Sequence, residues 1–195
     1  MLKKLFLIKA LFIMCFSLSS LEAIEVLPEA RAAYYYATDR HFRDIYSETG
    51  LYSIETSVEA WNRIYPFTSL GFLYTSGSSM GEGDSTELYM IPIGLGAKYI
   101  FDLDWFQPYL GLGMVVAYSH IHNQSKYVAR HQSEWGVGGI AKSGFLAYLT
   151  KNVFLDIFCD YTYLKVTFDN SGKNTSNRRA DLSGLSVGGG VGYRF

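Results

Sequence analysis

Hydrophobic and polar residues alternate with a period of two along most of the chain. In residues 88–100, one face is wholly apolar and begins and ends with tyrosine, whereas the other carries mainly small residues and one lysine. The apolar face consists of Tyr89, Ile91, Ile93, Leu95, Ala97 and Tyr99. The same alternation recurs in residues 52–60, 153–163 and 184–195. Because successive side chains of a strand point to opposite faces, these stretches predict β-strands and do not fit helical spacing.

Weaker alternation predicts four further strands, which brings the expected number to eight. These lie at residues 30–38, 66–75, 106–118 and 134–148. The connections between the strands alternate in length. Long polar connections are expected near residues 39–50, 76–86, 119–133 and 169–180, and short ones near residues 61–65, 102–105 and 150–152. Short turns at one end and long loops at the other are typical of outer-membrane barrels.

Two architectures suit eight up-and-down strands, a membrane barrel and a soluble lipocalin-like barrel. A soluble barrel buries large apolar residues inside and shows charge outside. In this chain the apolar face is continuous, whereas the opposite face holds glycine, serine and isolated charges and is too small and polar for a dry lumen. We therefore expect an all-β, eight-stranded antiparallel up-and-down transmembrane β-barrel, with the apolar face toward lipid and tyrosines at headgroup level.

The start of the chain has the parts of a secretory signal peptide. Lys3 and Lys4 precede a short apolar run, and Ala23 supplies the small residue at a cleavage site. We expect residues 1–23 to be removed and residues 24–195 to form the barrel domain. The alternative is an uncleaved anchor helix, for which the apolar run is short, because a spanning helix needs about 20 residues.

Composition narrows the classes of function. Lys and Arg number 17 against 18 Asp and Glu, so there is no basic excess of the kind that nucleic-acid binding requires. Glycine, tyrosine and phenylalanine are abundant, which suits a β-rich chain. The cysteines are Cys15 and Cys159, so removal of the leader leaves no intramolecular disulfide. Lipidation of Cys15 is the other reading of this segment, although no small residue directly precedes it.

Three stretches carry a resemblance to a known class of proteins. The chain ends in Val187-Gly-Gly-Gly-Val191-Gly-Tyr193-Arg-Phe195, which resembles the C-terminal assembly signal of outer-membrane barrels, with Val191, Tyr193 and Phe195 as its apolar residues. The stretches Ile-Pro-Ile-Gly-Leu-Gly-Ala-Lys-Tyr at 91–99 and Gln-Pro-Tyr-Leu-Gly-Leu-Gly at 107–113 resemble the small barrels of the OmpW, OmpX and opacity-protein type. The resemblance extends as a pattern over about residues 28–195 and implies location in a bacterial outer membrane. The partners expected there are outer-membrane lipid and lipopolysaccharide, the barrel assembly machinery, and a host or surface ligand.

The strand parity directs several charged side chains toward the lumen. They are Glu55, Glu59, Lys98, Lys142, Asp156, Asp160 and Arg194, with Arg31 as a further candidate. An eight-stranded barrel has an interior just filled by side chains, so we expect these groups to pair with one another, plug the barrel and hold the strand register. The alternative is a narrow route for ions or protons.

Polar residues of the expected long connections suggest two kinds of chemistry. The histidines His41, His120, His122 and His131 have the side chain that binds divalent metals, but no carboxylate or cysteine completes a recognisable spacing. His131, Ser133 and Glu134 are the residue types of a Ser–His–acid triad, which is defined by geometry and not by proximity in sequence. We expect solvated histidines, no metal or cofactor, and no enzyme.

Three classes of function remain for such a barrel. The sequence favours a structural or cell-surface interaction protein with a plugged lumen and four exposed loops. The second class is a narrow conduit for ions or small solutes, and the third is a lipid-modifying outer-membrane enzyme. The glycines do not add a nucleotide-binding function, because they lie inside strands with no helix following. We expect them to make room in the lumen for larger neighbours.

Overall fold

The computed structural model describes residues 24–46, 49–78, 85–123, 131–168 and 178–195. The expected signal peptide at residues 1–23 lies outside these described residues. Within the described ranges, no helix combines the length and the apolar character needed to cross a membrane.

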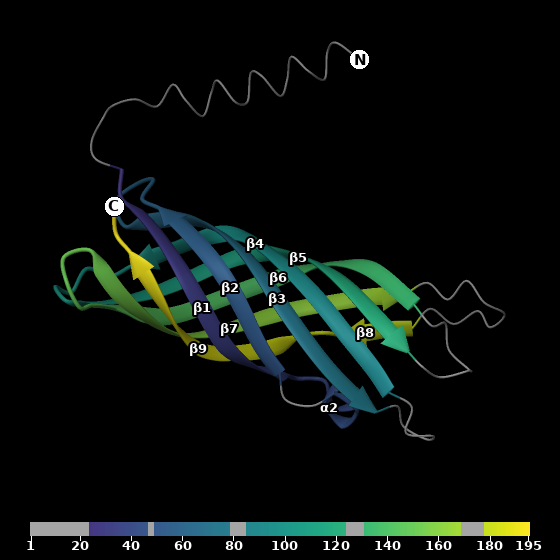
Figure 1. Cartoon of the computed structure of the whole chain (residues 1–195). Helices are drawn as coiled ribbons and strands as arrows, with labels where there is room; N and C mark the ends of the chain where they lie inside the picture. The colour runs from purple at the N-terminus through teal and green to yellow at the C-terminus, as the bar shows by residue number, and fades with distance from the viewer. Residues whose placement is uncertain (1–23, 47–48, 79–84, 124–130, 169–177) are drawn as a thin grey trace, which may run out of the picture.

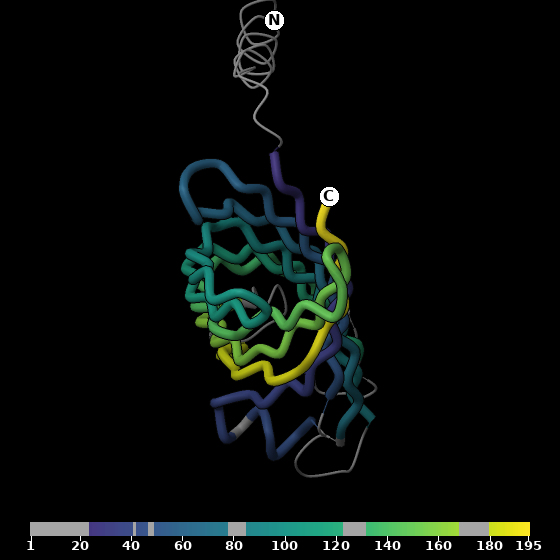
Figure 2. The backbone as a smooth tube through the Cα atoms, turned by 90° about the vertical axis from the view of Figure 1, so that its left-hand side faces the viewer, coloured from purple at the N-terminus to yellow at the C-terminus, as the bar shows by residue number. Residues whose placement is uncertain are grey.

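The described strands form one antiparallel sheet that closes on itself, seen from the side in Figure 1 and turned by 90° in Figure 2. The strands are β1 (Val26–Ala37), β2 (Thr49–Val58), β3 (Ile64–Ser78), β4 (Ser85–Ile100), β5 (Phe106–Asn123), β6 (His131–Tyr148), β7 (Val153–Phe168), β8 (Arg178–Asp181) and β9 (Gly184–Tyr193). A short helix, α2 (Arg40–Ile45), follows β1. Each strand from β1 to β7 pairs with the next, and β9 pairs with both β7 and β1. The barrel is therefore closed.

Strands β8 and β9 occupy the same position in the barrel wall. Both pair with β7, β8 with its last residues and β9 with its first. Between them the backbone of Leu182 still donates to the carbonyl of Leu164 at 2.9 Å, and Ser183 Oγ accepts from the Leu164 N–H at 3.0 Å. They form one interrupted strand, so the prediction of an eight-stranded antiparallel barrel is confirmed.

Exposure follows the predicted alternation. Ile93, Leu155, Ile157 and Val187 lie on the outside, each with 39–50% of its surface exposed. Their neighbours Gly94, Asp156 and Ser186 are buried in the lumen. Because β1 pairs with β9, the sheet formed by the described strands has no free edge; an open edge in hydrocarbon would cost roughly several kcal/mol for each unpaired backbone group.

Several strands are longer than the sequence pattern indicated. Strands β5 and β6 each have 18 residues and include residues 119–123 and 131–133, which were expected to be connections. A membrane crossing needs only about 9–11 tilted residues. Strands β3 to β7 therefore extend beyond the apolar belt at the end of the barrel that carries the long connections. We call this the long-connection end, and the opposite end, with turns at residues 59–63, 101–105 and 149–152, the short-turn end.

The lumen contains two apolar layers that the alternation pattern did not predict. The layer toward the long-connection end is made of Tyr35, Ala37, Leu73, Leu88, Met90, Val115, Ala117, Leu164, Val166 and Leu182. The layer toward the short-turn end is made of Leu27, Ala33, Tyr65, Ile100, Tyr109, Leu146, Phe154 and Phe158. The expectation of a lumen holding only small and polar groups is wrong, because large residues from different strands alternate there with glycines of their neighbours.

Candidate functional site

Seven charged side chains and one tyrosine meet in the lumen, where they interleave with the apolar layer toward the short-turn end, and we call this group the lumen cluster. It consists of Glu29 and Arg31 of β1, Glu55 of β2, Lys98 of β4, Tyr109 of β5, Lys142 of β6, and Asp156 and Asp160 of β7. None of these residues has more than 5% of its surface exposed. The period of two places each of them on the lumen side, and closure of the sheet brings their strands together.

Arg31 lies at the centre of the lumen cluster. Its Nη1 is 3.1 Å from Oε2 of Glu55 and 3.0 Å from Oδ2 of Asp160, and its Nε is 3.1 Å from Oδ2 of Asp156. Nη2 donates to the hydroxyl of Tyr109 at 3.3 Å. The guanidinium also lies 3.5 Å from the centroid of the Phe158 ring. An arginine suits this position because its planar group carries five donors and stacks on aromatic faces.

Two lysines complete the network of ion pairs. Nζ of Lys98 is 3.2 Å from both Oε1 of Glu29 and Oε1 of Glu55. Nζ of Lys142 is 2.9 Å from Oε2 of Glu55 and 2.7 Å from Oδ2 of Asp160. Glu55 therefore contacts all three cations. A cavity of about 50 Å³ lies beside Arg31, Lys142 and Asp160.

Glycines of β9 make room for this arrangement. Gly190 lies opposite Arg31, and a Cβ added to it would come within 3.0 Å of Cγ of Arg31 and 2.9 Å of the Ala30 carbonyl oxygen. A Cβ on Gly192 would lie 2.2 Å from the ring of Phe154. The expectation that these glycines accommodate larger lumen neighbours agrees with these distances.

The structure brings together most of the charged residues that the sequence placed in the lumen. Glu55, Lys98, Lys142, Asp156 and Asp160 all belong to the lumen cluster, and the further candidate Arg31 is its centre. Glu29 was missed because the first strand was expected to begin at residue 30, whereas β1 begins at Val26. The signal that reveals it is its spacing of two residues from Arg31, which puts both on one face of a strand.

Glu59 and Arg194 lie outside the lumen cluster, at the short-turn end of the barrel. Strand β2 ends at Val58 and β9 ends at Tyr193, so each of them follows the last residue of its strand. The guanidinium of Arg194 lies 5.4 Å from the centroid of the Tyr148 ring, which packs against the apolar layer of the lumen toward the short-turn end. Glu59 Oε1 accepts from the backbone N–H of Arg63 at 3.3 Å in a short turn. Arg194 pairs with Glu25 at the short-turn end.

The sheet geometry places the acid of the Ser–His–acid candidate on the opposite face of β6 from the serine. Nδ1 of His120 lies 2.6 Å from Oγ of Ser133, its register partner on β6. Glu134 follows Ser133 in the same strand and therefore points to the opposite face. The side chains of His41 and His131 lie outside the described residues. In the part of the chain that the structure describes, no group of three or more His, Cys, Asp or Glu side chains is arranged to hold a metal ion.

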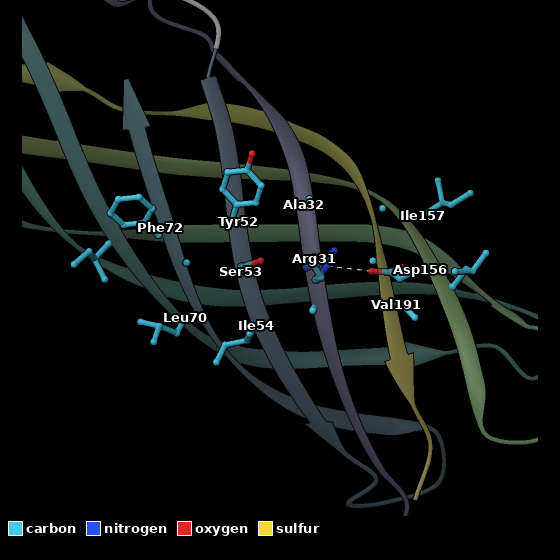
Figure 3. A pocket seen from close by; sticks show the side chains of 16 residues that line it. Arg31, Ala32, Tyr52, Ser53, Ile54, Leu70, Phe72, Asp156, Ile157 and Val191 are labelled. Atoms are coloured by element: carbon cyan, nitrogen blue, oxygen red, sulfur yellow. Dashed lines mark ion pairs between the residues drawn. The ribbon is translucent and has the colours of Figure 1, made fainter. Parts of the chain in front are cut away.

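The outer wall carries a shallow apolar groove over the strands that enclose Arg31. The groove has a volume of about 930 Å³, and Ala30, Ala32 and Gly189 supply small residues along it. Figure 3 shows Tyr52, Ile54, Leu70, Phe72, Ile157 and Val191 pointing away from the barrel around it. In the same view, Arg31 and Asp156 are joined by an ion pair on the inner side of the wall. The wall thus separates an apolar outer surface from a charged interior by the thickness of one strand.

The apolar residues of the C-terminal segment share the outer face. Val191, Tyr193 and Phe195 are 52%, 43% and 74% exposed, and the rings of Tyr193 and Phe195 lie 4.7 Å apart between centroids. The backbone N–H of Phe195 donates to the carbonyl of Val26 at 3.0 Å, which holds the end of the chain beside the start of β1.

Comparison with known proteins gives a family match and a set of similar folds. The sequence model described as "Opacity family porin protein" matches residues 29–195. A search of curated proteins finds no match. Similar solved structures include OprG of Pseudomonas aeruginosa, with a TM-score of 0.60, 14% identity and coverage of 88% of this chain and 95% of that one. Ail of Yersinia pestis, in complex with the heparin analogue sucrose octasulfate, has a TM-score of 0.59 at 13% identity, covering 88% and 99%. Neisserial surface protein A has a TM-score of 0.51 at 18% identity, covering 88% and 97%.

Proposed function

The chain belongs to the opacity family of porin proteins, and from this premise we propose that it acts at the cell surface as an interaction protein with a closed lumen. It is a β-barrel of the bacterial outer membrane. Its long-connection end is the part that we assign to the outside, where four loops are exposed, and its short turns face the periplasm. This orientation follows the usual asymmetry of such barrels.

The observation that supports a closed lumen is the filling of the barrel by charged and apolar side chains. The lumen cluster interleaves with the apolar layer toward the short-turn end, and the second apolar layer lies toward the long-connection end. The interior cavity beside Arg31 has a volume of only about 50 Å³. Water occupies about 30 Å³ per molecule in the liquid, so this space suits one or two waters and not a continuous path. We assign the lumen cluster the task of plugging the barrel and holding the strand register.

The surface that remains for a partner is the long-connection end. Strands β3 to β7 project there beyond the apolar belt, and α2 lies at the same end (Figure 1). The exposed side chains there include Arg40, Arg43 and Lys165. Because Ail has been solved with a heparin analogue, we propose that the ligand of this chain is a host or surface molecule with anionic groups.

Two further partners follow from the position of the barrel. The apolar outer wall contacts outer-membrane lipid, with lipopolysaccharide around the aromatic residues of the long-connection end. The C-terminal segment ending at Phe195 engages the barrel assembly machinery during export. Both are proposals that rest on the exposure of the residues concerned.

Two measurements on the refolded protein test the proposed function. Single-channel recording in planar bilayers is expected to give no steady open level, and vesicles carrying the protein are expected to bind immobilised heparin more than empty vesicles do. The variant in which Arg40, Arg43 and Lys165 are all changed to Gln is expected to lose this binding. A steady conductance without binding would instead assign the protein to the conduit class.

A lipid-modifying enzyme is the least supported of the three classes. The family description and the names of the similar structures refer to porin, surface and attachment proteins. The Ser133 hydroxyl has His120 beside it, but Glu134 points to the opposite face of the strand. Release of fatty acid from lipopolysaccharide vesicles by the wild type, abolished by Ser133→Ala, would restore this class.

A further inference from the structure

The lumen cluster has one more acid than it has bases. Its acids are Glu29, Glu55, Asp156 and Asp160, and its bases are Arg31, Lys98 and Lys142. Four carboxylates against three cations leave one negative charge uncompensated among the described buried residues. An isolated charge in a poorly solvated interior is costly, and a carboxylate so placed becomes neutral instead. We propose that the folded barrel holds one proton at neutral pH, on the carboxyl group of Glu29.

The contacts of the four acids select Glu29. Glu55 touches all three cations, and Asp160 touches Arg31 and Lys142. Asp156 is paired with Arg31 and accepts from the hydroxyl of Tyr109 at 3.0 Å. Glu29 has Lys98 as its single ion-pair partner among the described residues, and it shares that lysine with Glu55. It is therefore the acid with the weakest compensation for a negative charge.

The geometry around Glu29 favours a proton. Its Oε1 accepts from Lys98, whereas its Oε2 is fully buried and has no donor within the described part of the chain. Oδ1 of Asp160 is also buried without a donor, but the Asp160 carboxylate is paired with two cations through Oδ2. Burial with a single donor favours the neutral form of a carboxyl group, because the charged form needs donors or cations to compensate for its lost hydration.

The surroundings of Glu29 favour a proton over a bound metal cation. The charged and titratable groups that face it are Arg31 of its own strand, Glu55 of β2, Lys98 of β4, Tyr109 of β5 and Asp156 of β7. Strand β9 presents glycine at its register partner, Gly192, whose space is occupied by Phe154. The 50 Å³ cavity lies beside Arg31, Lys142 and Asp160, and Glu29 is not among the residues that line it.

A proton held in the folded barrel couples stability to pH. In the unfolded chain an exposed glutamate is ionised at neutral pH, so the folded state binds one proton more than the unfolded state. Stability then falls as the pH rises toward the point where Glu29 loses this proton. Glutamine imitates the protonated acid because it is neutral and has the same shape, and its carbonyl can still accept from Lys98. Glu29→Gln is therefore expected to fold and to lose this pH dependence.

Infrared spectroscopy of the refolded protein in D₂O at neutral pH tests the proposal. The wild type is expected to show the carbonyl band of a protonated carboxylic acid, separate from the carboxylate bands. Labelling glutamate with ¹³C at the side-chain carboxyl should shift this band, and Glu29→Gln should remove it. The matched control Glu25→Gln, which changes a glutamate paired with Arg194 at the short-turn end, should keep the band.

Three other results would each overturn the proposal. A wild-type spectrum without the band at neutral pH, from protein that is folded by gel mobility, overturns the proposal. So does a band that aspartate labelling shifts and glutamate labelling does not. If sodium, but not a bulky organic cation, stabilises the wild type and no band appears, the missing charge is supplied by a metal ion and the proposal is wrong. The labelled wild type decides the matter even if Glu29→Gln fails to fold.

Discussion

Arg31 and Asp156 form an ion pair across a strand that lies between them. Arg31 is on β1 and Asp156 is on β7, and Gly190 of β9 is the register partner of both. Because Gly190 has no side chain, Nε of Arg31 reaches to 3.1 Å from Oδ2 of Asp156 over the β9 backbone. The pair exists only in the closed barrel, since β9 joins β1 and β7 at the closure.

Filling the space at Gly190 should break this arrangement. A side chain there would meet Cγ of Arg31 and the Ala30 carbonyl, so Gly190→Val is expected to lower the free energy of unfolding by about 1–3 kcal/mol. Urea unfolding in lipid vesicles measures the change. The control Gly189→Val adds the same side chain to the outer face, where a Cβ would make only an ordinary contact at 3.4 Å. Equal losses in the two variants would show that strand glycine content matters and not the lumen space.

Removing the charge of Arg31 should lower the free energy of unfolding more than removing the charge of a surface arginine. Arg31→Met leaves the carboxylates of Glu55, Asp156 and Asp160 with too few partners and is expected to cost about 3–5 kcal/mol. Arg63→Met breaks an exposed pair with Asp102 and is expected to cost about 0–1 kcal/mol. The midpoints of urea unfolding under the same conditions give both values. A loss in Arg31→Met no larger than in Arg63→Met would contradict a stabilising role for the lumen cluster.

A charged substitution on the outer wall should lower the stability of the barrel more the deeper it lies in the membrane. Ile157 lies half exposed in the middle of β7, so Ile157→Arg is expected to destabilise the barrel by about 2–4 kcal/mol. Leu149→Arg, in a short turn, is expected to cost only about 0–1 kcal/mol. Spin labels at positions 156 and 157 provide a second measurement, with greater access of a lipid-soluble relaxing agent at 157. The opposite order of access would refute the assigned strand parity.

The terminal aromatic residue should matter more for assembly than for stability. Phe195 is 74% exposed, so Phe195→Ala removes little buried area and keeps the backbone bond to Val26. We expect a reduced outer-membrane yield in cells and nearly unchanged refolding in detergent, judged by heat-modifiable gel mobility. Trp105→Ala, which removes another exposed aromatic residue at the short-turn end, should leave the yield in cells unchanged. If Phe195→Ala impairs refolding as much as yield, the ring is a stability element and not a signal.

Much of the barrel could be predicted from the sequence because alternation is a local property. The apolar rows that contain Ile93 and Ile157 identify strands and their lipid face without knowledge of any partner strand. The ends of the strands were predicted less well. Residues 119–123 and 131–133 are polar enough to predict a connection, yet they pair with each other because β5 and β6 continue past the membrane.

The candidate site could be predicted only in part, because alternation does not show where a strand begins or ends. Alternation places Glu55, Lys98 and Asp156 inside, but it does not mark where a strand ends. It therefore could not separate Glu59 and Arg194, which lie at the short-turn end, from the lumen cluster. The signal for Glu29 was present in its spacing from Arg31 and was lost with the expected start of the first strand.

The sequence by itself determined the strand character, the inward and outward faces and the charge types of the lumen, because each depends on residues near one another in the chain. Only the tertiary structure decided which charges meet. The pairing of charges depends on closure and register, which bring Arg31 and Asp156 to the same glycine although they are 125 positions apart in the sequence. Register is a relation between strands, so no single strand's pattern contains it.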